Sequence, residues 1–535
     1  MPRRVVLACA LLAGAAALSF AAPEDDFISA IPAASAPEPV AAALAGIRAE
    51  ALAAHVAFLA SPALEGRGLG SRGLDAAAEY VASFLALHGI PPLADEGRAR
   101  YFQPVPLREL SGYTGELTIE ARRGGKLRRR AIAPGKDCVF AASAPRGAGG
   151  PIVFAGHGVR EESLHHDDYA DLDVRGKVVL VLAGVPAGEA WQTPALTARY
   201  AAEDVDDRWE AKLDSAAALG AAAVLALDPQ DAGRQETRFF LGAEAPEPGP
   251  VLVRLSGAAA RSVLAATGLD KGDVRPRALE SARAQVRTRA RERKVESRNV
   301  LGVITGSDPA LRDEAIVIGA HLDHLGRRGD AIYPGADDNS SGVAALLEIA
   351  RVFAALPARP ARSIVVAFWT GEEEGKFGSG HYVRHPAWPL ARTRAYVNLD
   401  MIGHPWLPKE LEKLVADTGL AQGPAFLART SIADFAEPGI PVDAPALAEA
   451  LTWAGPVSGM ALHLDRCDGT RGGSDYRDFA RANVPWIRFF GNFFPAYHEP
   501  GDTPDALDAA QVRRMARLAF ATAWRLAAPD GREAR

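Results

Sequence analysis

From residue 299 onward, short apolar segments alternate with segments of helical periodicity. A short apolar run favours a buried strand, whereas apolar residues three and four positions apart favour a helix with one buried face. Strands separated by helices are typical of an α/β sheet, so we predict a mixed, mostly parallel sheet flanked by helices on both faces. The predicted strands are 299–304, 315–320, 363–369, 395–399 and 485–490, and the predicted helices are 342–354 and 511–526.

The chain before residue 112 has helical character. Residues 40–59 are helix-forming, and residues 74–87 carry apolar side chains at a helical period. Between these two stretches, Leu-Glu-Gly-Arg-Gly-Leu-Gly-Ser at 64–71 predicts a glycine-rich turn.

Residues 112–290 differ from the rest because short strand-forming pieces predominate there, with one helical stretch at 212–219. We predict that this segment is a β-rich second domain, inserted between residues 40–111 and residues 291–535. A chain of 535 residues is too long for one typical domain of about 100–200 residues, so two or three packed units are expected.

Composition excludes several classes of protein. Charged residues make up 24% of the chain and hydrophobic residues 48%, which argues against wholesale disorder. There are 60 basic and 66 acidic side chains, giving a formal charge of −6. Without a basic field, we expect neither nucleic acid nor anionic lipid as a partner.

Cysteine is scarce. The chain has three cysteines, Cys9, Cys138 and Cys467, which excludes a disulfide scaffold but leaves one bridge between Cys138 and Cys467 open. No Cys-x-x-Cys pair occurs, so any metal must be held by His, Asp and Glu side chains.

The first residues predict export. Arg3 and Arg4 precede an apolar run at 5–20 and small residues, which together are typical of a signal peptide, here 1–21. Residues 22–39 are rich in Ala and Pro and predict a linker. No other hydrophobic stretch is long enough to cross a bilayer, so we expect a periplasmic or extracellular protein without a stable membrane span. General secretory and twin-arginine export both stay open.

Metal-capable side chains follow four of the predicted strands. In open α/β sheets, ligands bind beyond the carboxyl ends of the strands, so these side chains are expected to meet in one cleft. They are His321 and Asp323, Asp338, Glu372 and Glu373, Asp400, and Tyr497 and His498.

Each of these pieces alone has an ordinary structural interpretation. Residues 372–374 could form a solvated acidic loop, and Asp337 with Asp338 could cap the helix at 342–354. Asp400 is harder to dismiss, because an unpaired carboxylate after an apolar strand is costly to desolvate. The coincidence of all the pieces at strand ends favours a functional site.

The order and spacing of these blocks resemble the secreted di-zinc aminopeptidases, relatives of the glutamate carboxypeptidase and transferrin receptor group. The resemblance covers most of the mature chain, and residues 64–71 and Gly-Gly-Ser-Asp at 472–475 also look like family landmarks. The strongest blocks are His-Leu-Asp-His-Leu-Gly at 321–326, Gly-Ala-Asp-Asp-Asn-Ser-Ser-Gly at 335–342, Gly-Glu-Glu-Glu-Gly-Lys-Phe-Gly-Ser at 371–379, Asn-Leu-Asp-Met-Ile-Gly at 398–403 and Tyr-His-Glu-Pro-Gly-Asp-Thr at 497–503.

The resemblance implies two zinc ions per chain. His321 and Asp400 would bind one ion, Glu373 and His498 would bind the other, and Asp338 would bridge them. Histidine nitrogen and carboxylate oxygen are suitable zinc ligands, and two zinc ions about 3.5–4 Å apart need a bridging carboxylate and can generate hydroxide at neutral pH.

The resemblance also implies the catalytic groups. Glu372 would be the general base that takes the proton from water. Asp323 is expected to accept the second ring N–H of His321, and Tyr497 is expected to donate to the tetrahedral oxyanion.

Several positions depart from the family pattern or stay open. Tyr476 stands where many relatives carry His, and Lys376 with Phe377 replaces a commonly aliphatic pair. His324 is either a pocket group or a packed loop histidine. For the cluster at 165–168, we expect an exposed loop rather than a metal site.

The β-rich segment resembles a protease-associated domain. The resemblance is carried by Gly-His-Gly at 156–158, by residues 168–179 and by residues 212–227. It implies a lid or a role in substrate selection.

The expected function is a zinc-dependent exopeptidase acting on the N-termini of peptides or proteins, because a carboxylate-rich cleft suits a free α-amino group. A carboxypeptidase or dipeptidase on the same metal core is the first alternative. A glutaminyl cyclase with one zinc and a non-catalytic receptor are further alternatives. The sequence does not indicate the preferred side chain or the oligomeric state.

Overall fold

The computed structural model describes residues 26–29, 36–93, 101–135, 137–141, 147–200, 205–228, 237–242, 249–269, 272–420 and 422–529. The predicted signal peptide lies outside these residues, as does most of the predicted linker. The chain divides into two compact units. Met1–Pro106 and Glu296–Arg535 form the larger unit, and Leu107–Val295 forms the smaller one.

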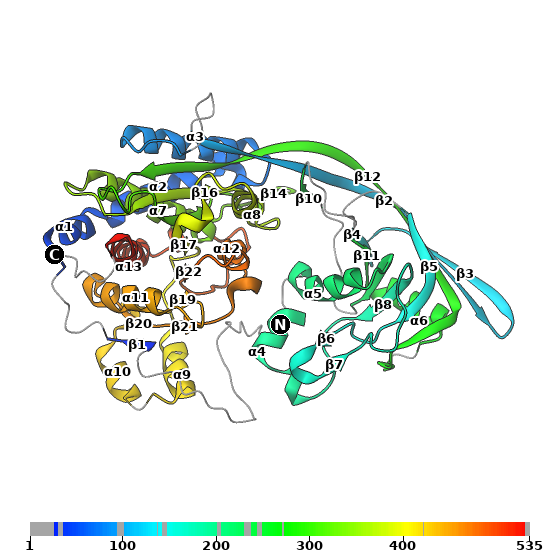
Figure 1. Ribbon diagram of the computed structural model, residues 1–535. Coiled ribbons are helices and arrows are strands. Elements are labelled where there is room, and N and C mark those ends of the chain that lie inside the picture. Colours follow the sequence, from blue (N-terminus) through cyan, green and yellow to red (C-terminus); the bar gives the residue numbers. More distant parts are fainter. Residues whose placement is uncertain are drawn as a thin grey trace. The chain divides into compact units, whose positions relative to one another are not determined.

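A mixed, mostly parallel sheet forms the centre of the larger unit (Figure 1). Its strands lie in the order β21, β19, β22, β17, β13, β16 and the end of β12. Strand β13 pairs in parallel with β16 and β17, and β17 with β22, whereas β12 and β19 run antiparallel to their neighbours β16 and β22. The predicted sheet is therefore confirmed. The bounds are β12 (Arg277–Ile304), β13 (Ala315–His321), β16 (Ser363–Trp369), β17 (Thr393–Leu399), β19 (Gly439–Ile440), β21 (Asp465–Arg466) and β22 (Trp486–Phe489).

Helices bury both faces of this sheet. Ile316 and Ile318 of β13 belong to one hydrophobic core with α2 (Ala49–Leu59), α7 (Gly342–Ala355) and α13 (Ala509–Ala527). Val317, between them, belongs to a second core with α8 (Phe377–Arg384) and α12 (Tyr476–Arg481). Successive side chains of a strand point to opposite faces, so a strand buried on both faces is apolar throughout.

Some helices differ from the prediction. The stretch 40–59 forms two helices, α1 (Glu38–Gly46) and α2, because Arg48 is extended between them. Three helices between residues 405 and 460 were not predicted: α9 (Pro408–Thr418), α10 (Gly423–Arg429) and α11 (Pro445–Ser458). Within the described ranges, no single helix is long and apolar enough to cross a membrane, although α1 and α2, bent by 45°, meet that test together.

Further short elements complete the larger unit. Helix α3 (Arg72–Leu87) covers the predicted stretch 74–87, and Pro62–Arg67 before it is a 3-10 segment. Strands β1 (Phe27–Ile28), β20 (Ala461–His463) and β18 (Phe435–Ala436) form a small sheet, and β14 (Gly326–Arg328) pairs with β15 (Ala331–Tyr333).

In the smaller unit, strands β5, β8, β9 and β11 pair in parallel, with β4 antiparallel at the edge. It also has more helix than the sequence predicted, since α6 is alanine-rich and shows little periodicity. Its elements are β2 (Phe102–Arg123), β3 (Lys126–Ile132), β4 (Cys138–Ala141), β5 (Gly147–Phe154), β6 (Arg160–Glu161), β7 (His166–Asp167), β8 (Val178–Leu182), β9 (Ala223–Leu227), β10 (Arg238–Leu241), β11 (Val251–Leu255), α4 (Pro194–Tyr200), α5 (Val205–Ala218) and α6 (Gly257–Thr267), with β2 and β12 each contributing to both units.

The expectation of an exposed loop at 165–168 is wrong for three of its residues, since His166–Asp167 form β7 and Asp168 is buried. His166 lies in β7 and its Nε2 atom is 2.9 Å from Oδ1 of Asp168, which is buried. Asp168 also accepts the backbone N–H of Val159, so the cluster closes a turn. Cys138 and Cys467 are both free thiols.

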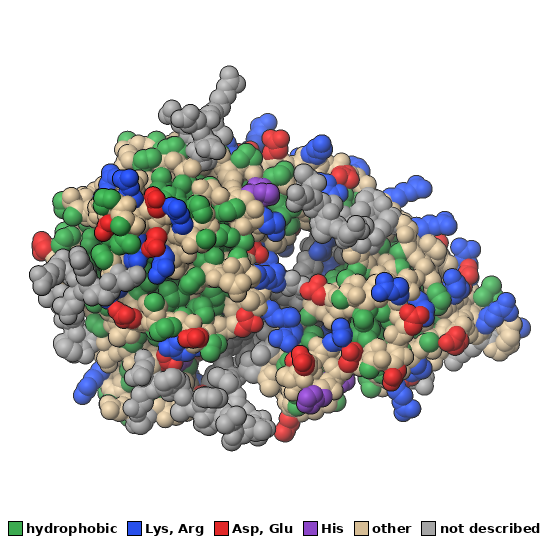
Figure 2. All heavy atoms as spheres, in the orientation of Figure 1, with side chains coloured by type: hydrophobic (Ala, Val, Ile, Leu, Met, Phe, Trp, Pro, Cys, Tyr) green, Lys and Arg blue, Asp and Glu red, His purple; other side chains and the backbone are tan. Residues whose placement is uncertain are grey.

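Basic and acidic side chains are interspersed over the face of the molecule in Figure 2.

Candidate metal centre

The candidate site lies where neighbouring strands of the larger unit end. His321 is the last residue of β13, and the parallel register pairs it with Trp369, the last residue of β16. On the other side of β13, Gly319 pairs with Asn398 of β17, and Asp400 follows that strand. Because parallel strands end at the same edge of a sheet, the loops after these three strands begin next to one another.

His321, Asp338 and Asp400 form the first group of metal donors. The Nε2 atom of His321 lies 3.3 Å from Oδ1 of Asp338 and 3.3 Å from Oδ1 of Asp400. His321 and Asp338 are buried. The structure thus brings together the three side chains that the sequence assigned to one metal ion, close enough to hold one.

His498, Asp338 and Glu373 form the second group. The Nε2 atom of His498 lies 3.1 Å from Oδ2 of Asp338 and 3.1 Å from Oε2 of Glu373. Asp338 therefore turns one carboxylate oxygen toward His321 and the other toward His498. This is the arrangement required of a carboxylate shared by two cations.

The backbone around Asp338 is held by neighbouring acids. Asp502 accepts the backbone N–H of Asp337 at 2.9 Å and that of Asp338 at 3.1 Å. The carboxylate of Asp337 accepts the N–H of Gly403 at 2.7 Å and lies 2.6 Å from Nδ1 of His404. Asp337 thereby joins the loop before α7 to the loop after β17, while Asp338 stays available in the site.

Asp323 is buried beside His321 and faces its second ring nitrogen, as expected, but through the backbone rather than the carboxylate. The Nδ1 atom of His321 lies 3.1 Å from the backbone carbonyl oxygen of Asp323. The carboxylate instead accepts the backbone N–H groups of Glu372 at 3.1 Å and Glu373 at 3.3 Å. One buried residue thus uses its carbonyl for the histidine and its side chain for the glutamate loop.

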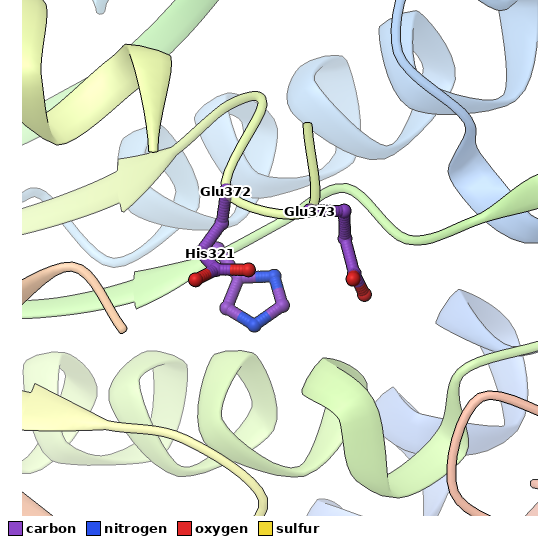
Figure 3. Close-up of side chains that lie close together, drawn as sticks. All are labelled: His321, Glu372 and Glu373. Atoms are coloured by element: carbon purple, nitrogen blue, oxygen red, sulfur yellow. The ribbon is translucent and has the colours of Figure 1, made fainter. Parts of the chain in front are cut away.

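Glu372 and Glu373 project from the loop after β16, and Figure 3 shows the Glu372 carboxylate beside the ring of His321. Burial raises the pKa of the Glu372 carboxyl to about 8, against the opposing effect of Lys376 and His321. The charge of a bound dication would lower this pKa. A carboxyl that changes protonation near neutral pH suits a general base.

Charge in the site is balanced between histidines and acids. Burial disfavours charged histidine, but Asp400 and Asp338 outweigh it and raise the pKa of His321. Against the same burial, Glu373 and Asp338 raise the pKa of His498 to about 11. The histidines in turn hold the pKa of Asp338 well below its usual range, despite its burial. A bound cation would take the place of the protons on these histidines.

His324, which the sequence left between a pocket group and a packed loop residue, lies in the site. Its Nδ1 atom is 2.5 Å from Oε1 of Glu373 and 3.8 Å from Oδ2 of Asp338. His324, Asp338 and Glu373 form a further group close enough to hold a metal ion. The sequence showed only that His324 follows His321 by three residues, and this spacing does not determine where its ring points.

Arg67 is a buried residue to which the sequence assigned no role. Its guanidinium donates to the carbonyl oxygens of Leu322 at 2.9 Å, Pro334 at 2.8 Å and Gly335 at 3.0 Å, and to that of Leu59 at 2.5 Å. These carbonyls lie in the two loops that carry His324 and lead to Asp338, and at the end of α2. Arg67 therefore connects the glycine-rich segment at 64–71 to the loops of the metal centre.

Two tyrosines named in the sequence lie in different surroundings. Tyr497 is 37% exposed, and its ring stacks on that of His498 at 3.9 Å between centroids. Partial burial, together with Asp338, raises the pKa of Tyr497, so its hydroxyl keeps the proton it would donate. Tyr476 is buried and stacks on Trp486 at 4.6 Å, outside the metal-binding groups found among the described residues.

The donors present fit zinc. Imidazole nitrogen and carboxylate oxygen are its usual ligands apart from thiolate, and two histidines and two further carboxylates converge around the shared Asp338. Buried acids at this density require compensation by positive charge, which a cation supplies.

Residues 299–426 and 444–523 match the model of peptidase family M28. These segments, which carry the candidate site, are similar to that family. All five predicted metal donors and Glu372 lie within the matched segments. The recognition of a peptidase family from the sequence blocks is confirmed.

Curated relatives match part of the chain. An aminopeptidase of Pseudomonas aeruginosa is 38% identical over 114 residues, which is 21% of this chain and 19% of that protein. A probable zinc metalloprotease of Leptosphaeria maculans is 28% identical over 255 residues, covering 44% of this chain and 58% of the relative. The chain therefore covers about a fifth to just over half of these relatives.

The similarity to a solved structure extends over most of the chain. The solved structure of an aminopeptidase from Aneurinibacillus sp. strain AM-1 superposes with a TM-score of 0.54 at 20% identity. It covers 91% of this chain and 95% of that structure. At this identity the likeness establishes the shared fold.

Proposed function

We propose that this protein is a zinc-dependent aminopeptidase that hydrolyses N-terminal residues of peptides. The proposal is carried by Asp338, whose two carboxylate oxygens face two different histidines. It is supported by the match of 299–426 and 444–523 to peptidase family M28 and by the aminopeptidase named among the relatives.

Two zinc ions fit the two groups of donors. His321 and Asp400 would hold one ion, Glu373 and His498 would hold the other, and Asp338 would bind both. When bound, the ions lower the pKa of water and polarise the scissile carbonyl. A content of two zinc ions per chain would distinguish this protein from a glutaminyl cyclase with a single zinc.

The protein's own groups would move the proton and stabilise charge. Glu372 would take a proton from the attacking water and deliver it to the leaving amine. Tyr497, beside His498, would donate its hydroxyl hydrogen to the oxyanion that develops on the carbonyl. Asp323 would keep Glu372 and Glu373 in place through their backbone N–H groups.

The acidic character of the centre favours aminopeptidase over carboxypeptidase activity, because a free α-amino group complements carboxylates. A peptide series blocked at either end tests this choice. Peptides amidated at the C-terminus should be cleaved, and N-acetylated peptides should resist. Cleavage of the N-acetylated series with resistance of peptides lacking a free C-terminus would instead establish the carboxypeptidase.

The Glu372→Gln variant tests the general base. We expect it to retain zinc, because Glu372 is not assigned as a ligand, and to lose about two or more orders of magnitude in kcat. Unchanged activity would remove Glu372 from the mechanism. Metal analysis of the parent should give two zinc ions per chain, and an inactive, metal-free parent would instead indicate a receptor-like protein.

We also propose export to the periplasm or outside the cell, from the pattern at residues 1–21. The unit Leu107–Val295 is proposed to be a protease-associated domain that selects substrates. The N-terminal sequence of the secreted protein tests the first proposal, and cleavage rates for peptides of increasing length test the second.

A further inference from the structure

Lys376 lies four residues after Glu372, at the start of α8. Its Nζ atom is 3.2 Å from Oε1 of Glu372. The two side chains are 11% and 8% exposed, so the ion pair is largely withdrawn from water. A lysine in such a place loses much of its hydration and needs a carboxylate nearby to remain charged.

Backbone hydrogen bonds fix the position of Lys376. Its N–H donates to the carbonyl oxygen of Glu372 at 2.9 Å, and the next residue, Phe377, donates to Gly371 at 2.9 Å. Lys376 has a φ of 60°, in the left-handed region that few residues other than glycine adopt. The hydrogen-bonded turn from 371 to 377 thereby brings the side chain of Lys376 next to that of Glu372.

Phe377 packs against the same turn. A Cβ atom built on Gly371 would lie 3.1 Å from the Phe377 ring, so ring and glycine are in close contact. This packing limits movement of the turn and of the ammonium group that it carries. The pair Lys376–Phe377 therefore acts as one local unit around Glu372.

We propose that Lys376 is a positioning residue for the general base. Its ammonium group holds Oε1 of Glu372 and leaves Oε2 to accept the proton of the attacking water. The inference rests on the proposed role of Glu372 and adds to it the residue that orients the carboxylate. Lys376 acts on the rate of the proton transfer, not on substrate binding or on metal binding.

The test uses three variants of the full-length, zinc-loaded protein. Lys376→Met keeps an unbranched side chain but removes the charge, and Lys376→Arg keeps the charge. Lys413→Met is the matched control, because Lys413 forms an ion pair with Asp417 at 2.6 Å at the same four-residue spacing but is 56% exposed on α9.

We expect Lys376→Met to lower kcat by about 10–100-fold, the range that follows from misorienting a catalytic group. KM should stay within about twofold, zinc content should not change, and Lys376→Arg should recover at least part of kcat. Lys413→Met should behave as the parent. A raised KM with unchanged kcat would overturn the inference in favour of substrate binding.

A double-mutant cycle keeps the test independent of folding defects. If Lys376 acts through Glu372, the Lys376→Met change should have little further effect on kcat in a Glu372→Gln protein. An equal loss of kcat in both backgrounds would overturn the inference. Absence of hydrolysis by the parent would instead contradict the proposed function, so the two failures are distinguishable.

Discussion

The Nη2 atom of Arg67 donates a hydrogen bond of 3.0 Å to the carbonyl oxygen of Gly335, just before the Asp337–Asp338 pair. Gly335 has a φ of 62°, and a Cβ atom there would meet the carbonyl oxygen of Asp338 at 2.2 Å. No larger residue fits this position without movement of the backbone. The buried guanidinium of Arg67 thus holds in place the loop that carries Asp338, the carboxylate shared by the two groups of metal donors.

Replacing Arg67 by Lys is expected to weaken zinc binding by about tenfold or more, because lysine cannot donate in the several fixed directions of a guanidinium. Chelator competition measures the affinity. Arg362→Lys is the control, since Arg362 is equally buried and donates to the carbonyl oxygens of Leu526 and Ala528 at the end of α13.

Both variants should lose thermal stability, but only Arg67→Lys should lose metal affinity. Equal zinc affinity in parent and Arg67→Lys proteins would show that Arg67 serves the fold alone.

Much of the site could be read from the sequence because its donors sit directly after apolar strands. A strand buried on both faces gives a continuous apolar run, and its last residue marks the edge of the sheet. His321 ends β13 in this way, and Glu372 and Asp400 follow β16 and β17. Their convergence then follows from parallel pairing.

Other contacts in the site could not be predicted from the sequence, because they depend on where individual side chains and backbone groups point. Arg67 binds backbone carbonyls, which carry no signature in the sequence of the loops that contain them. Asp323 uses its carbonyl and its carboxylate for different partners, and spacing alone does not distinguish the two. The orientation of His324 is set by Glu373, a residue of another loop.

The second metal ion has two possible histidine neighbours, and substitution separates their roles. His498 faces both carboxylates through one nitrogen at 3.1 Å, whereas His324 contacts Glu373 closely but lies 3.8 Å from Asp338. We expect His498→Ala to lose one zinc ion per chain, and His324→Ala to retain both with affinity lower by about 10–100-fold, as for a residue that supports a ligand. Metal analysis after dialysis would contradict this assignment if His324→Ala lost one ion and His498→Ala kept both.

Zinc affinity should rise with pH. Nearby carboxylates outweigh burial at both histidines: they raise the pKa of His321, and they raise that of His498 to about 11, so the ring of His498 carries a proton at neutral pH when no cation is bound. Each proton that zinc displaces makes the apparent affinity about tenfold stronger per pH unit, up to the pKa of that ring. Titrations between about pH 6 and pH 8 in buffers of different ionisation enthalpy should detect this proton release. An affinity that is independent of pH would contradict a protonated His498 in the free site.

A second prediction on pH concerns the stability of the fold and rests on Glu348, which lies outside the groups of metal donors. It accepts hydrogen bonds from Arg351 at 2.9 and 2.7 Å, and Nε2 of His55 lies 3.7 Å from it. Burial alone would raise the pKa of Glu348, but the contacts with His55 and Arg351 outweigh it and lower the pKa from 4.5 to about 2. The folded protein therefore holds this carboxylate more tightly in its charged form than the unfolded chain does.

A depressed folded-state pKa contributes stability that is present above pH 4.5 and is lost as the pH falls toward 2. We expect Glu348→Gln to lower the free energy of unfolding by about 1–3 kcal/mol at neutral pH, a difference that shrinks in acid. Denaturant unfolding of metal-free protein across this range measures it without interference from zinc. Glu449→Gln is the control, because Glu449 pairs with Arg525 at the surface with its side chain 68% exposed, where such pairs contribute about 0–1 kcal/mol. A constant difference between parent and Glu348→Gln from neutral pH to about pH 2 would contradict a shifted carboxyl at Glu348.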